Sequence, residues 1–230
     1  MADYKNLIPF IRKSEGGLSS ATTDSASKNP SNCGKGKNGQ WYHTNKGVQW
    51  TTFKNLADRG GYVANCTNFL TMPDDIWEKI YKIGFWDAIK GDQIKNQAIA
   101  NTFVEMTWGS GLGSINGYAG SLPMLRRFFK ANYDKDVTSM SDIVDYVNKL
   151  DSQGKTSVLF EKLYTYRANK YKALNQPKNL QGWLNRLNKF YFLNKPYAIS
   201  KTEKLTTLAT LTLIVVGIVL YKKYYGGAVK

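Results

Sequence analysis

The residues best suited to chemistry begin with a glutamate that closes the first amphipathic segment. Leu7, Ile8 and Ile11 fall on one face of a helix that is expected to start near residue 6. The sequence Glu-Gly-Gly at residues 15–17 ends this helix, because glycine is typical of a helix C-terminus. A glutamate in a last turn faces the negative end of the helix dipole, which disfavours its ionised form. Glu15 is therefore a candidate general acid, and a solvated surface residue is the alternative.

Two further polar side chains could supply the other groups that cleavage of a glycosidic bond requires. Such cleavage needs an acid for the leaving oxygen and a carboxylate that activates water or attacks the anomeric carbon. Asp24 lies nine residues after Glu15 in a polar segment, where it would stay ionised and act as the base. Thr44 follows that segment, and its hydroxyl could hold the water. This spacing alone is a weak signal, because such pairs of acidic residues are common.

Several other residues are candidates for contacts with a sugar. Aromatic rings stack on the apolar C–H faces of saccharides, although most rings in helical proteins belong to the core. The ring candidates are Trp41, Tyr42, Trp108 and Tyr118. His43 is expected to contact sugar or solvent rather than to act as a base. Glu105 either lines the cleft or has a structural role, bonding a nearby loop or facing solvent.

The cysteine and histidine content limits the other possible chemistries. Cys33 and Cys66 allow either a disulfide or two free thiols. With no Cys-x-x-Cys motif and no His/Cys cluster, the sequence predicts neither a metal site nor a cofactor. His43 is the only histidine, so a Ser-His-Asp or Cys-His mechanism would have to use that residue.

Apolar periodicity predicts a mainly α-helical chain. The stretch from Leu18 to Gln40 is polar and aperiodic, which predicts a long loop. Beyond it, apolar residues recur at helical spacing in several segments. The predicted helices cover residues 76–84, 92–108, 123–133, 141–150, 157–174 and 181–192.

An apolar segment near the C-terminus forms a separate unit. Residues 205–220 carry no charge, and lysines flank this run on both sides. As a helix, residues 205–221 would span about 25 Å, near the short end for a bilayer. Lysines and tyrosines at the boundaries favour a transmembrane helix, whereas the threonines within it would also suit a buried core helix. No signal peptide is expected, because charged residues interrupt the N-terminal apolar run.

The net charge of +15 favours a polyanionic partner. Nucleic acid, anionic lipid and the acidic bacterial cell wall all fit this description. No nucleic-acid-binding motif is present in the sequence, so nucleic acid is not expected as a partner.

Several motifs, in order along the chain, together resemble glycoside hydrolase family 108. The first are Glu15-Gly16-Gly17, Asp24 and the segment Thr44-Asn45-Lys46-Gly47-Val48. Later ones are Gly84 to Asp92, Phe103 to Gly111, Leu125 to Phe128 and Gly182 to Leu187. The resemblance covers about residues 5–193. This chain differs from the family pattern in its longer loop before Thr44 and in having Glu105 where an aspartate is usual.

The resemblance implies a lysozyme-like, two-lobed helical fold and cleavage of peptidoglycan between N-acetylmuramic acid and N-acetylglucosamine. It implies Glu15 as the proton donor, with Asp24 and Thr44 directing water. The expected organisation is a muramidase domain, a linker, a transmembrane helix and a basic tail. Their bounds are 1–196 (a catalytic lobe of about 1–70 and a peptidoglycan-binding lobe of about 71–196), 197–204, 205–221 and 222–230.

Two other functions remain open at this point. A lytic transglycosylase would use Glu15 alone, and a non-catalytic virion protein would only bind the wall. The predicted helix at 205–221 also implies contact with a lipid bilayer and a single-pass location near the C-terminus. We therefore expect a bacteriophage protein in a viral internal membrane or the bacterial inner membrane, with its catalytic domain facing peptidoglycan. The oligomeric state is not indicated.

Overall fold

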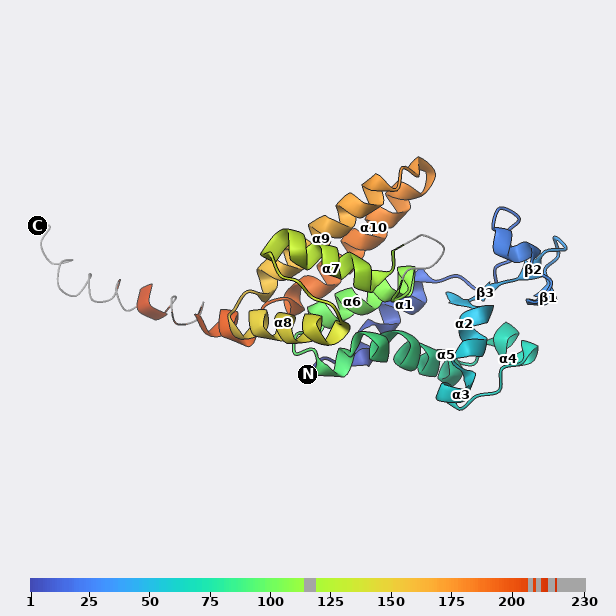
Figure 1. Cartoon of the computed structure of the whole chain (residues 1–230), viewed down its shortest axis with the longest axis horizontal. Helices are drawn as coiled ribbons and strands as arrows, with labels where there is room; N and C mark the ends of the chain where they lie inside the picture. The colour runs from blue at the N-terminus through green and yellow to red at the C-terminus, as the bar shows by residue number, and fades with distance from the viewer. Residues whose placement is uncertain (114–118, 207–208, 210–211, 215–217, 219–230) are drawn as a thin grey trace, which may run out of the picture. The chain divides into compact units, whose positions relative to one another are not determined.

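The computed structural model describes residues 1–113, 119–206, 209, 212–214 and 218, which fold mainly into helices (Figure 1). The prediction of a mainly helical chain is confirmed. The chain divides into two compact units: unit 1 contains Met1–Ile94 and Ala100–Val144, and unit 2 contains Lys95–Ile99 and Asp145–Lys230. The predicted catalytic and peptidoglycan-binding lobes remain a functional prediction.

Unit 1 begins with a short helical segment whose apolar face is buried. A 3-10 helix, η1 (Tyr4–Leu7), continues directly into α1 (Ile8–Ser14). Pro9 lies in the first turn of α1, where a missing N–H removes no helical hydrogen bond. Leu7 and Ile11 are completely buried, as their spacing in the sequence indicates. Burial of these side chains fixes the end of α1 against the rest of unit 1.

Two small antiparallel hairpins follow α1 in unit 1. The first pairs β1 (Cys33–Lys35) with β2 (Trp41–Tyr42), and the second pairs β3 (Thr44–Asn45) with β4 (Val48–Gln49). The Ser19 N–H donates to the Thr44 carbonyl at 2.8 Å, which attaches the chain after α1 to β3.

The polar stretch 18–40 is more ordered than the sequence predicts. It contains a 3-10 helix, η2 (Ser25–Lys28), and the strand β1. Backbone pairing and a disulfide hold this stretch in place, and neither leaves a periodic pattern of apolar residues.

Short helices and aromatic rings complete the part of unit 1 that follows the hairpins. The helices are α2 (Trp50–Asn55), α3 (Ala57–Gly60), α4 (Cys66–Thr71) and α5 (Asp74–Tyr81). A π-helical turn, η3 (Lys82–Trp86), and two 3-10 turns, η4 (Asp87–Ile89) and η5 (Gly91–Gln93), come next. The rings of Trp50, Phe53 and Phe69 pack with centroids 5.1 to 5.6 Å apart. These rings form a local core beside the hairpins.

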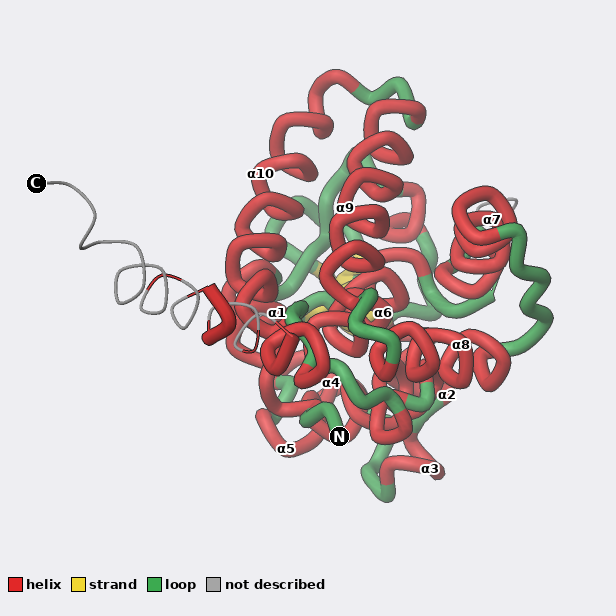
Figure 2. Tube along the Cα trace, turned by 90° about the vertical axis from the view of Figure 1, so that its left-hand side faces the viewer, coloured by secondary structure: helices red, strands yellow, loops and turns green. Residues whose placement is uncertain are grey.

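The longer helices occupy the second half of the chain. They are α6 (Gln97–Ser110), α7 (Ser121–Tyr133), α8 (Met140–Ser152), α9 (Thr156–Ala173) and α10 (Pro177–Asn194), followed by a 3-10 turn, η6 (Lys195–Tyr197). In unit 2, α9 and α10 run side by side (Figure 2), and Phe160 stacks on Tyr191 with centroids 5.5 Å apart. The sequence places these helices well, except that α6 starts later than residue 92 because η5 intervenes.

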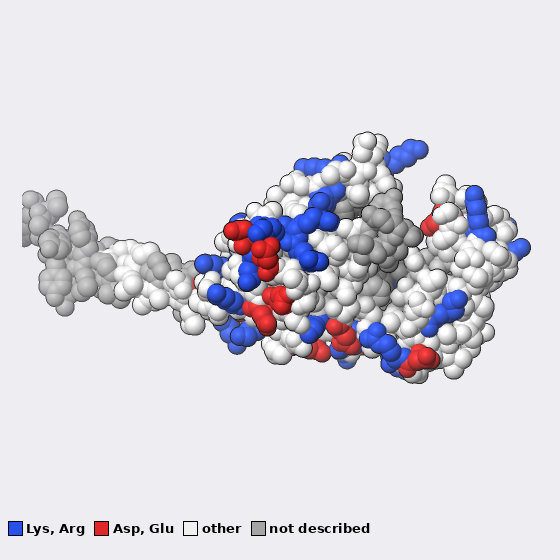
Figure 3. All heavy atoms as spheres, in the orientation of Figure 1, with Lys and Arg blue, Asp and Glu red and all other residues white. Residues whose placement is uncertain are grey.

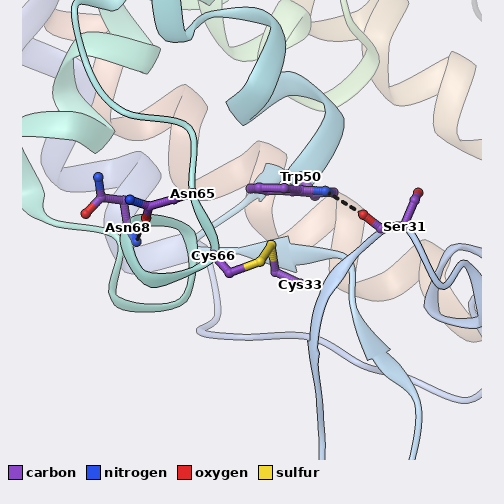
Figure 4. The surroundings of a disulfide bond; sticks show 6 residues. All are labelled: Ser31, Cys33, Trp50, Asn65, Cys66 and Asn68. Atoms are coloured by element: carbon purple, nitrogen blue, oxygen red, sulfur yellow. Dashed lines mark hydrogen bonds between the residues drawn. A yellow bond between two sulfur atoms is a disulfide. The ribbon is translucent and has the colours of Figure 1, made fainter.

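A disulfide between Cys33 and Cys66 resolves the alternatives that the sequence left open. It joins β1 to the start of α4 across 33 residues, with a Cα–Cα distance of 5.2 Å (Figure 4). Nearby, the Trp50 indole N–H donates to the Ser31 carbonyl at 2.8 Å. The Asn65 side chain accepts from the Asn68 N–H at 2.7 Å and so caps α4. The disulfide therefore ties the polar stretch to the aromatic core.

The predicted transmembrane helix and single-pass membrane location are corrected by the structure. Among the described residues, no helix combines the length and the apolar character needed to cross a bilayer. The uncharged run from 205 to 220 is itself short, since about 20 apolar residues are needed to cross about 30 Å of hydrocarbon. Residues 207–208, 210–211, 215–217 and 219–230 lie outside the described part. Lipid contact through 205–221, and the virion setting inferred from it, lose their support.

Removal of the disulfide is expected to destabilise unit 1. A double Cys33→Ala, Cys66→Ala variant should lose about 2–4 kcal/mol of unfolding free energy, because the crosslink restricts a long loop in the unfolded chain. Urea unfolding of the variant beside the oxidised wild type measures this loss. Equal stability of the two proteins, or two titratable thiols in the native wild type, would contradict the assignment.

Candidate active site

Glu15 lies immediately after α1 and begins an extended segment. Its backbone has φ −97° and ψ 141°, and its N–H donates to the Ile11 carbonyl at 3.1 Å. The residue therefore caps the helix, one position beyond the last turn in which the sequence placed it. Glu15 is half-buried, whereas Gly16 and Gly17 are exposed. The Glu15 side chain is therefore partly covered by the rest of the protein at the point where the chain leaves α1.

Trp108 of α6 holds this carboxyl group. The indole N–H of Trp108 donates to Glu15 Oε1 at 2.9 Å. The indole ring in turn packs against Phe85, Trp77 and Tyr81, with centroid distances of 4.5, 5.5 and 6.0 Å. Since these rings restrict the indole, its N–H fixes the position of Oε1.

The turn between β3 and β4 approaches the same carboxyl group. Lys46 and Gly47 both have positive φ, 45° and 79°, as a two-residue type I′ hairpin turn requires. A Cβ atom on Gly47 would lie 2.7 Å from Glu15 Oε2 and 2.8 Å from Trp108 Cζ2. Only glycine permits this close approach. The turn therefore borders the pair formed by Glu15 and Trp108.

Polar contacts hold this turn against α5. The Trp77 indole N–H donates to the Lys46 carbonyl at 3.0 Å, and the Lys46 ammonium donates to the Met72 carbonyl at 2.9 Å. Asp74 bridges Arg12 of α1 at 2.9 Å and Lys46 of the turn at 3.2 Å. The hydrogen bond from Arg12, and then that from Lys46, lowers the pKa of Asp74 below its ordinary value of 3.8. One carboxylate thus links the helix before Glu15 to the turn beside it.

Asp24 and Thr44 both face the ring of His43. Asp24 Oδ1 accepts from the Ala26 N–H at 2.9 Å and caps η2, and Asp24 Oδ2 lies 3.6 Å from His43 Nε2. The other ring nitrogen, Nδ1, lies 2.8 Å from Thr44 Oγ1. The structure therefore joins three of the predicted site residues in one chain of contacts.

The remaining predicted residues have separate places. Trp41 and Tyr42 lie on β2, which Figure 1 shows apart from α1, and the Lys35 ammonium lies 4.9 Å from the centre of the Trp41 ring. Glu105 is buried in α6, with 4% of its surface exposed. Tyr118 lies outside the described residues. Their contacts with sugar remain predictions.

No metal site accompanies these groups in the described part of the chain. There, no group of three or more His, Cys, Asp or Glu side chains is placed to hold a metal ion.

The sequence did not predict the turn and the ion pairs that position Glu15. The Asn-Lys-Gly sequence at 45–47 carried a detectable signal, because glycine in a short turn between strands favours a hairpin. The pairing of Asp74 with Arg12 and Lys46 carried none, since it joins residues far apart along the chain.

Substitution of Gly47 tests whether the turn sets the position of Glu15. Gly47→Ala is expected to lower glycan cleavage by about 10²-fold, because the methyl group displaces the Glu15 carboxyl or the turn. Gly39→Ala is the matched control, since Gly39 has φ 73° but open space around its Cβ position. Equal activity of the two variants would show that the close approach has no effect.

Asp74→Asn tests the bridge through its pH dependence. Because folding lowers the pKa of Asp74, its contribution to stability is present above the ordinary value of 3.8 and is lost as the pH falls. The variant should have a lower Tm than the wild type at about pH 7 and a shallower decline below about pH 4. Asp75→Asn, whose ion pair is with Lys79 at 3.9 Å, is the control. If the Tm of Asp74→Asn and that of the wild type change with pH in parallel, the bridge from Asp74 to Arg12 and Lys46 is contradicted.

Comparisons with known proteins bear on this geometry. Residues 8–111, a little under half of the chain, match the family model described as glycosyl hydrolase 108. A solved structure titled "Structure of Brucella abortus SagA" aligns with 86% of this chain and 97% of its own, at a TM-score of 0.57 and 16% identity. No curated protein gives a significant match. The structural likeness shows a shared fold, and the family match, which includes both Glu15 and Trp108, supports a glycoside hydrolase.

Proposed function

We propose that this chain is a peptidoglycan hydrolase that cleaves the glycan between N-acetylmuramic acid and N-acetylglucosamine. The observation that carries the proposal is the carboxyl group of Glu15, fixed by the Trp108 indole at 2.9 Å within the residues that match glycosyl hydrolase 108. A positioned carboxyl group at the start of the matched segment is what a proton donor requires.

Glu15 acts as the general acid in this proposal. Oε1 accepts the indole N–H, so the acidic hydrogen is carried on Oε2, beside the Gly47 turn. Glu15 gives this hydrogen to the bridging oxygen as the bond to the anomeric carbon breaks. Water adds to that carbon, and its proton passes to Asp24. Because water enters opposite the leaving group, the anomeric configuration inverts.

The charge and the disulfide of the chain are consistent with this substrate. A net charge of +15 favours approach to the anionic polymers of a cell wall. Figure 3 shows lysine and arginine side chains spread over the visible face, several of them beside acidic groups. Lys130 of α7 pairs with Asp134 and Asp136 at 2.9 and 3.0 Å. Disulfides persist outside the reducing cytosol, where peptidoglycan also lies.

Glu15→Gln tests the assignment directly. The variant keeps an oxygen to accept from the Trp108 indole but has no transferable proton, so cleavage should fall by about 10²–10⁴-fold while the Tm stays unchanged. The measurement is release of muropeptides from purified peptidoglycan by the full chain, with mass spectrometry of the products. Reducing ends are expected.

Glu78→Gln is the matched control for this experiment. Glu78 is also half-buried and accepts a hydrogen bond, from the Tyr4 hydroxyl at 2.9 Å. This variant should cleave as the wild type does. Full activity of Glu15→Gln would overturn the proposal. Products with 1,6-anhydro ends would replace it with a lytic transglycosylase, in which Asp24 is dispensable.

A further inference from the structure

His43 lies between β2 and β3, and its imidazole is largely buried. Its side chain is 9% exposed. The His43 N–H donates to the Ser19 carbonyl at 3.1 Å, and the His43 carbonyl accepts from the Trp50 N–H at 2.9 Å. With the backbone bonded on both sides and the ring enclosed, the two ring nitrogens face fixed partners.

The partners on each nitrogen determine where the ring carries its hydrogen. Nε2 faces Asp24 Oδ2 at 3.6 Å and Ser19 Oγ at 3.3 Å. An ionised carboxylate only accepts hydrogen bonds, so it favours the tautomer with hydrogen on Nε2. Nδ1 is then an acceptor, and its partner at 2.8 Å is the Thr44 hydroxyl. In this tautomer, Thr44 donates its hydrogen to the histidine.

This assignment also excludes a serine-hydrolase arrangement at the same residues. In a Ser-His-Asp triad the serine and the carboxylate contact opposite nitrogens of the ring. Here Ser19 and Asp24 both face Nε2. The residue on the opposite nitrogen is Thr44, adjacent to the histidine in sequence.

We propose that His43 is a positioning residue that fixes the hydroxyl of Thr44, an inference that rests on the proposed function. When the Thr44 hydroxyl donates its hydrogen to Nδ1, its oxygen can only accept a hydrogen bond from a water molecule. Water therefore donates one hydrogen to Thr44 and is oriented with a lone pair toward the anomeric carbon. Asp24, which faces the opposite ring nitrogen, sets the tautomer of His43. The side chain of Asp24 is 48% exposed, so solvent reaches it.

Two substitutions at His43 test the roles of the two ring nitrogens separately. The amide of asparagine occupies about the place of Nδ1 and can accept from Thr44. The amide of glutamine occupies about the place of Nε2 and contacts only the side of Asp24 and Ser19. We expect His43→Gln to lower kcat by about 10- to 100-fold with KM unchanged, and His43→Asn to recover about tenfold of that loss.

Thr44→Val completes the experiment. It should lower kcat as much as His43→Gln does, and the double variant should lose no more than either single variant, because both remove the same oriented hydroxyl. Digestion of purified peptidoglycan by the full chain gives kcat and KM, and the Tm of each variant reports on folding.

The outcomes distinguish this inference from the proposed function. An inactive wild type, or a fully active Glu15→Gln, refutes the proposed function itself. If wild type cleaves and Glu15→Gln does not, three results overturn the role of His43 alone. The first is equal kcat of the His43→Gln and His43→Asn variants. The second is a kcat loss in the double variant equal to the sum of the two single losses. The third is a kcat loss that is explained by a lowered Tm.

Discussion

The hydrogen bond from the Trp108 indole to Glu15 is the interaction on which the candidate site depends. It joins the end of α1 to the end of α6 across 93 positions of sequence, and three aromatic rings restrict the indole that donates it. The Gly47 turn closes on the same two side chains. A carboxyl group at the end of a seven-residue helix would otherwise be free to sample solvent. Its placement therefore comes from packing around α6 and not from the helix that precedes it.

The second half of the candidate site has a different physical basis. Asp24 and Thr44 lie in the segment 18–49, whose first part, the polar stretch 18–40, contains little apolar surface to bury. Short hairpins, a backbone bridge at Ser19 and the Cys33–Cys66 disulfide order this segment instead. Such a segment can present polar groups to a substrate while keeping them in fixed positions. The contacts of His43 with Asp24 and Thr44 are made within it.

The sequence predicted the fold better than it predicted the site. Helical periodicity located the long helices, because each buries one apolar face whatever its partner is. The membrane prediction was wrong: it read a short uncharged run as a bilayer span although its length was marginal. The order within 18–40 was missed because backbone hydrogen bonds and a disulfide leave no periodic pattern in a sequence.

Local chemistry is what the sequence by itself determined: a helix that ends at Glu-Gly-Gly, and the acidic Asp24 and the hydroxyl-bearing Thr44 that follow this helix. Tertiary structure alone decided the partners. It assigned Trp108 to Glu15, Asp24 and Thr44 to His43, and Cys33 to Cys66. The physical reason is that helix and turn formation depend on neighbouring residues, whereas a hydrogen bond between distant side chains depends on how the intervening chain packs.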